Sequence, residues 1–405
     1  MKNVLVITLG KGKWDTSGNP SYQTATYRFE DGAVSRPTRF VGMALYEWLQ
    51  EKVFVDKVVV LGTAGSIWHS LCDDAGSAFA DKLLESDFDL FSSLEEKCRA
   101  NVRDEELLDR LSAALSSAVG KEFACRYIPE GLTKGDQLRI LQIISGIGER
   151  GDAVYIDVTH GFRHLPMLEM MSAFLMKASY EIRGIYYGAF ENRDAGGITP
   201  VIGLSGLLHL QEWIEAMAVL RETGNVMPLS RIDSMTDFRA DLENYQFFIQ
   251  MNNVGNARGC AQRIIGGLRG ENIPDEAKLF REELTEIFAW GGDQDYARRQ
   301  LRQAEVAYQR GDNLRAIIML NEAVISARVA DPDKVLDIKA REAAADDLFK
   351  SGGDEWYVLR RLRNSTAHDG VRNDKSERVV KSMRSGRDAF KREMEKLFDW
   401  ARRQT

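Results

Sequence analysis

A chain of 405 residues is long enough for two or three domains, and a hydrophobic content of 44% is sufficient for their cores. The formal net charge of −7 argues against a protein that coats nucleic acid through bulk positive charge. The cysteines form no Cys-x-x-Cys pair, so we expect free thiols in a reducing compartment and no zinc site. The apolar run at 4–9 is too short for a signal peptide, and no run is long enough to span a membrane. We therefore expect a cytoplasmic protein without a membrane partner.

The first half of the chain alternates short apolar runs with amphipathic stretches. Runs rich in β-branched or aromatic residues are typical of buried strands, and they cover 4–9, 57–61, 123–128, 153–158 and 182–189. Helix-like stretches lie between them at 40–52, 104–119, 136–147 and 166–178. This βαβα order predicts an α/β domain with a mostly parallel, Rossmann-like sheet covered on both faces.

The pattern changes near Leu204, after which no convincing strand follows. Helical periodicity recurs at 237–251, 277–290, 296–309, 314–328, 334–349, 355–363 and 377–402. Glycine- and aspartate-containing breaks separate these stretches. The sequence thus predicts an α/β domain at 1–205, a helical linker region at 206–295 and an all-helical domain at 296–405.

Loops rich in glycine, lysine and hydroxyl residues follow the predicted strands, at 10–14, 62–68, 129–131 and 159–164. Ligands of open α/β sheets bind outside the carboxyl ends of the strands, where glycines and hydroxyl groups can hold phosphate oxygens. These loops therefore predict a nucleotide site. Gly10-Lys11-Gly12 lacks the third glycine of the dinucleotide-binding fingerprint. Gly12-Lys13 lacks both the upstream glycine and the following Ser or Thr of a P-loop. NAD binding and ATP hydrolysis are accordingly disfavoured.

Three of these loops carry a family resemblance. The string Asp157-Val-Thr-His-Gly-Phe-Arg-His-Leu-Pro resembles the signature of the CARF domains of CRISPR-associated accessory proteins. The loop at 62–68 resembles a loop that precedes this signature in CARF domains. The opening Leu9-Gly-Lys-Gly, followed by Tyr22 and Tyr27, also resembles such a loop. The resemblance implies a homodimer, or a higher even oligomer, that binds a cyclic oligoadenylate as allosteric activator, with cyclic tetra-adenylate the expected ring. It assigns the activator contacts to Gly10, Lys11, Gly12, Thr63, Gly65, Ser66, Thr159, His160, Gly161, Phe162 and Arg163.

Several loop residues have a plain structural alternative. Gly65 and Gly161 could be ordinary turn glycines, and Asp157 and Thr159 could cap the following helix instead of touching a ligand.

The histidines and tryptophans of the loops leave the same choice open. His160 and His164 suggest catalysis, although packing within the loop explains them equally well. Trp14 and Trp68 could stack on adenine, but aromatic residues beside a sheet edge more often belong to the core.

A second resemblance lies near the C-terminal end, in Arg363-Asn364-Ser-Thr-Ala-His368. The string resembles the catalytic motif of HEPN ribonucleases, which implies a HEPN-type helical domain with Arg363, Asn364 and His368 as catalytic residues. RNA can be cut without metal when the 2′-hydroxyl attacks its own phosphate, leaving a 2′,3′-cyclic phosphate. A guanidinium can stabilise the charge that develops, and an imidazole can move a proton near neutral pH. Asp369-Gly370 is typical of a helix end.

The alternative is that Arg363 lies on a solvated basic helix and that His368 is an ordinary residue at a helix end. Basic side chains gather in this region and could guide single-stranded RNA, although acidic residues interleave with them. They are Arg360, Arg361, Arg363, Arg372, Arg378, Lys381, Arg384, Arg387, Lys391 and Arg392.

The two resemblances together predict an endoribonuclease of CRISPR antiviral defence, activated by a cyclic oligoadenylate and cutting single-stranded RNA without a metal or other cofactor. The alternative is a non-catalytic, ligand-sensing regulator whose helical half binds a partner or nucleic acid.

Overall fold

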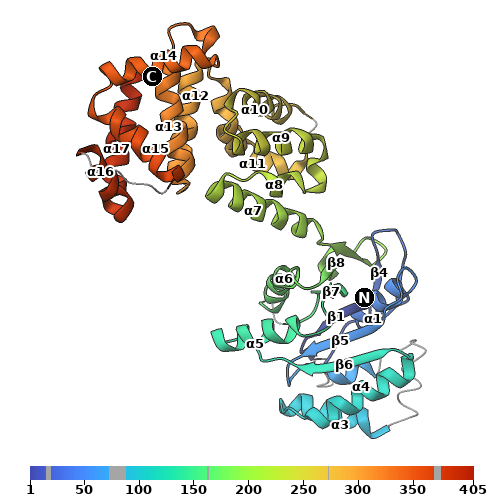
Figure 1. Ribbon diagram of the computed structural model, residues 1–405. Helices are drawn as coiled ribbons and strands as arrows, with labels where there is room; N and C mark the ends of the chain where they lie inside the picture. Colours follow the sequence, from blue (N-terminus) through green and yellow to red (C-terminus); the bar gives the residue numbers. More distant parts are fainter. Residues whose placement is uncertain (15–19, 73–87, 162–163, 272, 369–374) are drawn as a thin grey trace. The chain divides into compact units, whose positions relative to one another are not determined.

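The computed structural model describes residues 1–14, 20–72, 88–161, 164–271, 273–368 and 375–405, and it divides the chain into two compact units (Figure 1). The first unit is Met1–His209 and the second is Leu210–Thr405. The change therefore falls within a few residues of the predicted change at residue 205. The additional division at residue 295 stays a prediction.

The first unit is built on a seven-stranded sheet with the strand order β4-β9-β8-β7-β1-β5-β6. Its pairs are parallel except for β8 and β9, so the sheet is mixed but dominated by parallel pairing, as the sequence predicts. The strands are β1 (Asn3–Leu9), β4 (Thr26–Arg28), β5 (Lys57–Gly62), β6 (Glu122–Tyr127), β7 (Ala153–Asp157), β8 (Glu181–Gly188) and β9 (Ile198–Gly203). A separate two-stranded hairpin pairs β2 (Lys13–Trp14) with β3 (Pro20–Ser21).

Helices cover both faces of this sheet. The reason is that apolar side chains along β1 point alternately to its two faces. Leu5 and Ile7 belong to one core cluster, whereas Val4 and Val6 belong to another. Successive side chains of a strand point to opposite faces, so a fully apolar strand requires cover on both sides. The first cluster contains residues of α1 (Val41–Gln50), α3 (Phe88–Ala100) and α4 (Glu105–Val119); the second contains residues of α5 (Lys134–Ser145) and α6 (Leu165–Met176).

The register of the parallel strands brings their carboxyl ends to one edge. Leu9 at the end of β1 lies opposite Gly62 at the end of β5, and Ile7 lies opposite Asp157 at the end of β7. The loops that leave these strands therefore start side by side, which positions the predicted ligand loops together.

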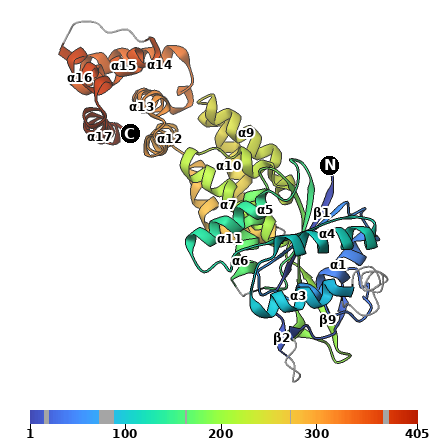
Figure 2. The same cartoon turned by 90° about the horizontal axis from the view of Figure 1, so that it is seen from below.

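The second unit is helical throughout its described part, with one contiguous core that includes Trp213, Phe288 and Trp356. Its shorter elements are α8 (Met227–Ser230), η3 (Asp233–Phe238), η4 (Ala289–Gly292) and η5 (Pro332–Lys334). The longer ones are α7 (Gly206–Thr223, which begins in the first unit), α9 (Arg239–Gln250), α10 (Val254–Leu268), α11 (Asp275–Phe288), α12 (Tyr296–Gln309), α13 (Asn313–Arg328), α14 (Ile338–Ser351), α15 (Gly353–His368), α16 (Lys375–Ser385) and α17 (Arg387–Gln404). Figure 2 shows α12, α13 and α17 grouped together.

One helical prediction is wrong. The stretch 377–402 is not a single helix, because Gly386 adopts an extended conformation with φ −156° and ψ 131° and separates α16 from α17. An extended residue interrupts the helical hydrogen bonds and allows α17 to fold back on α16, and the two helices are in contact.

Candidate functional site

A cavity of about 480 Å³ opens at the carboxyl edge of the sheet in the first unit. The loops after β1 and β7 contribute most of its predicted residues, and the β8–β9 region supplies one wall. Its lining comprises Gly10, Lys11, Gly12, Tyr22, Gln23, Tyr27, Arg39, Thr159, His160, Gly161, Tyr187, Gly188, Phe190 and Glu191. Six of the predicted activator contacts, Gly10, Lys11, Gly12, Thr159, His160 and Gly161, therefore share one cavity.

Tyr22 stabilises the loop after β1. Its hydroxyl accepts a hydrogen bond from Gly10 N at 2.7 Å and lies 3.3 Å from Gly10 O, to which it can donate. Burial raises the pKa of Tyr22 well above its usual range, so the phenol stays protonated. A Cβ on Gly10 would come within 2.9 Å of Gly161 N, so glycine allows the two loops to approach. Tyr22 contributes to the family resemblance but is absent from the predicted contacts.

His160 belongs to a cluster of three aromatic rings with Tyr22 and Phe40. Its ring stacks on Tyr22 at 4.2 Å and on Phe40 at 5.2 Å between centroids. Burial lowers the pKa of His160 from 6.5 to about 3, so the imidazole is neutral at physiological pH. The side chain packs within the loop while lining the cavity, and it cannot offer a positive charge to a phosphate.

Hydrogen bonds of Thr159 and Asp157 stabilise the loop after β7. The Thr159 hydroxyl donates to Asp157 Oδ1 and accepts from Gly188 N at 2.8 Å, and Thr159 N donates to the same carboxylate oxygen at 3.0 Å. Burial raises the pKa of Asp157 from 3.8 to about 7. Neither side chain caps α6, whose N-cap residue is His164 without a side-chain cap. Thr159 thus connects the ends of β7 and β8.

Gly161 completes this turn with φ +116°, a conformation that favours glycine. A Cβ there would also meet the Leu165 side chain at 3.2 Å. Gly161 is therefore a turn glycine that also lines the cavity. The predicted contacts Phe162 and Arg163 lie outside the described residues.

Lys11 places a positive charge at the cavity. Its ammonium group lies 2.9 Å from a carboxylate oxygen of Glu130, in the loop after β6. The backbone carbonyl of Glu130 lies 2.7 Å from His164 Nε2. Both partners of the ion pair are partly exposed, so solvent screens their attraction and an incoming anion can compete for Lys11.

The remaining predicted contacts support the loops and do not line the cavity. Thr63 and Ser66 are buried, and the Ser66 hydroxyl donates to Leu9 O and accepts from Thr63 N, both at 2.8 Å. The Trp68 indole donates to Thr63 O and its ring packs edge-on against Tyr127, so Trp68 belongs to the core. Gly65 also lies outside the lining. The side chain of Trp14 lies outside the part that the structure describes.

Sequence reasoning missed other lining residues, namely Gln23, Arg39, Tyr187, Phe190 and Glu191. Tyr187 lies near the end of β8, and Phe190 and Glu191 follow in the short 3₁₀ helix η2 (Phe190–Asn192) before β9. Since the run at 182–189 was predicted as a strand, the residues that follow it could have indicated a further loop at the same edge.

A buried carboxyl group lies beneath these loops. Glu169 on α6 is 2% exposed and accepts a hydrogen bond from the hydroxyl of Thr8 on β1. Burial and, to a smaller extent, nearby Asp157 raise the pKa of Glu169 from 4.5 to about 8, although the hydrogen bond from Thr8 opposes the shift. At neutral pH this carboxyl is therefore mostly protonated.

The predicted cutting residues lie at the end of α15 in the second unit. Arg363 and Asn364 are exposed, and the Arg363 guanidinium donates to Asn364 Oδ1 at 3.0 Å. His368 is the last residue of the helix, and its side chain lies outside what the structure describes, as do Asp369 and Gly370. On a regular helix Arg363 and His368 lie about 140° apart, whereas Asn364 and His368 share a face.

Two neighbouring arginines of α15 contact adjacent helices, Arg361 on the side of α16 and Arg360 on the side of α14. Arg361 forms an ion pair of 2.9 Å with Glu377 on α16, whose carboxylate is buried. Arg360 lies over the ring of Phe349 at 4.2 Å. The solvated-helix interpretation therefore fits Arg363 but not Arg360 or Arg361.

Loops that converge on one cavity at the carboxyl edge of a parallel sheet define a ligand-binding α/β domain. Residues 5–191 match the family model of the CARF domain of CRISPR system endoribonuclease Csx1. Among curated proteins, CRISPR-associated protein MJ1674 of Methanocaldococcus jannaschii is 30% identical over 254 residues, covering 57% of this chain and 38% of that relative. The matched region thus spans less than half the length of the relative. The comparisons support a CRISPR-associated protein with a CARF domain at its N-terminus and a mostly helical C-terminal half.

None of the helices in the described part of the chain is both long and apolar enough to cross a membrane. No group of three or more His, Cys, Asp or Glu side chains among the described residues could hold a metal ion.

Proposed function

We propose that this protein is a cyclic oligoadenylate-activated, metal-independent endoribonuclease that cuts single-stranded RNA in CRISPR antiviral defence. The observation that carries the proposal is the cavity that Gly10–Gly12 and Thr159–Gly161 line, because both segments fall within the CARF match. The helical unit contributes the motif of Arg363, Asn364 and His368.

The cavity offers what an oligoadenylate requires. The Lys11 ammonium and the glycine-rich backbone can hold phosphate oxygens, and the partly exposed ring of Tyr187 can stack on a base. A cyclic ligand with two-fold symmetry would contact two copies of this cavity, so each chain contributes half of the site.

Calorimetry with cyclic tetra-adenylate and cyclic hexa-adenylate tests this step. Lys11→Ala should weaken binding by about tenfold or more, since charge-assisted hydrogen bonds contribute about 1.5–3 kcal/mol. Lys339→Ala, at an exposed position on α14 in the second unit, is the matched control and should bind as the wild type. No binding of either ring would refute the sensing role.

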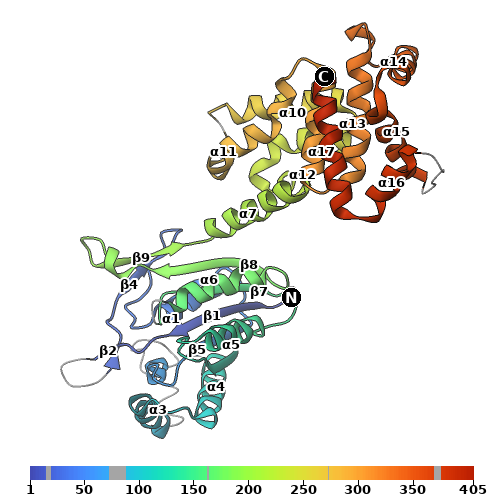
Figure 3. The same ribbon diagram turned by 90° about the vertical axis from the view of Figure 1, so that its left-hand side faces the viewer.

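An apolar stripe on α6 supports the proposed homodimer. Met167, Met171 and Leu175 recur every four residues and are 69%, 52% and 56% exposed. Leu138 on the neighbouring helix α5 is also exposed, and α5 and α6 lie side by side (Figure 3). Contiguous exposed apolar side chains mark interaction surfaces, and a symmetric dimer would bury this stripe against its own copy.

Light scattering after size exclusion tests the dimer. Met171→Glu should give a monomer, because it places a charge in the proposed interface. Leu279→Glu changes an exposed leucine on α11 and should leave the wild-type assembly unchanged. A dimeric Met171→Glu protein would mean that another surface joins the protomers.

The proposed cleavage needs no group from outside the chain and the RNA. The 2′-oxygen forms a bond to the adjacent phosphorus, the bond to the 5′-oxygen of the next nucleotide breaks, and a proton passes from the 2′-hydroxyl to that leaving oxygen. Arg363 would stabilise the charge on the phosphate, and His368 would move the proton. Asn364 would position the phosphate or His368.

Product analysis with excess EDTA tests this chemistry. Cleavage should persist and leave a 2′,3′-cyclic phosphate and a 5′-hydroxyl, and a 2′-deoxy substitution at the cut position should block it. Arg363→Ala should lower the rate by about a hundredfold or more, and Arg403→Ala, at an exposed position on α17, should not. Metal dependence would contradict the mechanism, whereas intact RNA with bound activator would favour a non-catalytic regulator.

Two protomers would form one cutting site. The angular separation of Arg363 and His368 on α15 favours groups from facing helices, and a misplacement of about 1 Å can cost a hundredfold in rate. A tagged heterodimer with one wild-type chain and one Arg363→Ala/His368→Ala chain should be far less than half as active. Half of the wild-type rate, without subunit exchange, would show that each protomer cuts alone.

A further inference from the structure

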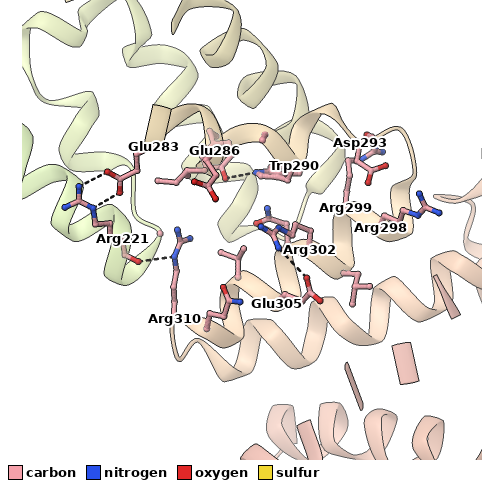
Figure 4. Close-up of a pocket in the computed structure, with 18 residues that line it drawn as sticks. Arg221, Glu283, Glu286, Trp290, Asp293, Arg298, Arg299, Arg302, Glu305 and Arg310 are labelled. Carbon is pink, nitrogen blue, oxygen red and sulfur yellow. Dashed lines mark hydrogen bonds and ion pairs between the residues drawn. The ribbon is translucent and has the colours of Figure 1, made fainter. Parts of the chain in front are cut away.

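The helical unit contains a second cavity, of about 790 Å³, that has no part in the proposed sensing or cutting (Figure 4). It lies between α7, α11 and η4 on one side and α12 on the other. Arginines dominate its lining: Arg221, Arg298, Arg299, Arg302 and Arg310. The lining carboxylates are Glu283, Glu286, Asp293 and Glu305.

Two of these carboxylates are already neutralised by arginines. Arg221 donates to both oxygens of Glu283, at 2.5 and 2.7 Å. Glu305 accepts from Arg402 at 2.8 Å and lies 3.8 Å from Arg302. Glu286 and Asp293 remain in the lining opposite the other arginines, so five arginines face four carboxylates and the lining carries a small excess of positive charge.

Arg310 is the most informative of the remaining arginines. Figure 4 shows it rising from the end of α12 toward Arg221 on α7, and its Nε donates to the backbone carbonyl of Arg221 at 3.3 Å. Gly224 has φ +73°, and a Cβ on it would overlap the Arg310 guanidinium. Burial lowers the pKa of Arg310, which reflects the cost of removing a cation from water without a counter-ion.

Arg299 supplies an independent observation. It is 6% exposed, and its Nη1 donates to the carbonyls of Asp293 and Gln294 at 2.7 and 2.9 Å, whereas its buried Nε has no hydrogen-bond partner. Among the described residues, none of Arg298, Arg299 and Arg310 forms an ion pair. These three arginines line the cavity along the length of α12, and the buried Nε of Arg299 is an unsatisfied donor.

We propose that this cavity binds a phosphate-bearing ligand. A guanidinium presents a fixed fork of donors that matches phosphate oxygens, and a bound anion would offset the cost of burying Arg299 and Arg310. The volume of the cavity is in the range of small-molecule sites and accommodates a nucleotide or a short piece of a nucleic-acid strand. The site does not depend on activator binding at the first unit.

Calorimetry on the full chain with inorganic pyrophosphate tests the proposal. Arg310→Gln should weaken binding by about tenfold to a hundredfold, and Arg302→Gln, at an exposed position on the cavity wall, should also weaken it without disturbing the fold. Arg269→Gln removes the same charge from the exposed end of α10 and should bind as the wild type. Lys11→Ala should also retain this binding, which separates it from the cavity of the first unit.

Two further probes identify the source of the phosphate. Tighter binding of uridine 5′-monophosphate than of a short oligodeoxyuridylate would indicate a free nucleotide, and the reverse order would indicate a strand. Either order supports the proposal if the Arg302 and Arg310 variants lose the binding. No binding of any probe, or unchanged binding in Arg302→Gln, would overturn it, even if Arg310→Gln fails to fold.

Discussion

Replacing Glu169 by glutamine should remove much of the pH dependence of stability of the first unit near neutral pH. Glu169 is buried on α6 beneath the ligand loops, with a pKa raised from 4.5 to about 8. A group whose pKa is raised on folding stabilises the fold fully below its unfolded pKa, and this contribution is lost as the pH rises through the folded pKa. The first unit should therefore become less stable between pH 6.5 and pH 8.

Two neighbouring groups also contribute to the pH dependence of stability around this range. Asp157, with a pKa raised to about 7, acts in the same direction up to about that pH. His160 acts in the opposite direction, because its pKa is lowered from 6.5 to about 3 and its contribution is lost as the pH falls from 6.5 through 3. Above pH 6.5 the two carboxyl groups dominate.

The expected size follows from linkage. Each pH unit over which only the unfolded chain is ionised changes the free energy of unfolding by about 1.4 kcal/mol, so Glu169 should contribute about 1–2 kcal/mol between pH 6.5 and 8. Glutamine is nearly isosteric, and its carbonyl oxygen can still accept the hydrogen bond from Thr8. The variant should retain only the smaller slope that Asp157 produces.

Hydrogen exchange of the amides in β1 and β7, corrected for the intrinsic dependence of exchange on pH, measures this stability within the first unit. Glu96→Gln removes a carboxyl group from an exposed position on α3 and should keep the wild-type slope. An equal slope in Glu169→Gln and wild type would refute the reasoning, whatever the absolute stability of the variant.

Three further substitutions test individual contacts. Thr159→Val removes the acceptor of Gly188 N and should lower the free energy of unfolding by about 1–3 kcal/mol in the same exchange measurement; an unchanged value would contradict this role of the hydroxyl. Gly161→Ala should cost about 1–3 kcal/mol because of its φ of +116°, and calorimetry should show weaker activator binding; wild-type behaviour would mean that the turn relaxes freely. Glu377→Gln should lower the melting temperature seen by circular dichroism, because Arg361 loses its charged partner, and no shift would show that the pair adds little.

Much of the first unit could be predicted because its central strands are buried on both faces. Such strands are continuous apolar runs, and the runs at 4–9, 57–61 and 153–158 agree with β1, β5 and β7 within one residue. The carboxyl edge follows from parallel pairing, so the residues after β1 and β7 could be placed at one site before the structure was known.

Other elements carry weak local signals. β9 contains Pro200, which has no amide hydrogen to donate, and the edge strand β4 has only three residues, so neither strand was predicted. α10 holds Gly255, Gly259, Gly266 and Gly267, a composition that disfavours a helix in isolation. Its burial against α9 and η4 offsets that cost, and packing of this kind is invisible in a short window of sequence.

By itself, the sequence determined which loops follow the strands and which residue types they carry. Tertiary structure decided where those side chains point. Ser66 and Thr63 form inward hydrogen bonds, while His160 stacks on Tyr22 and Phe40, which come from distant parts of the chain. The physical reason is that strand and loop types follow from local patterns, whereas burial, ring stacking and pKa depend on neighbours that only folding brings together.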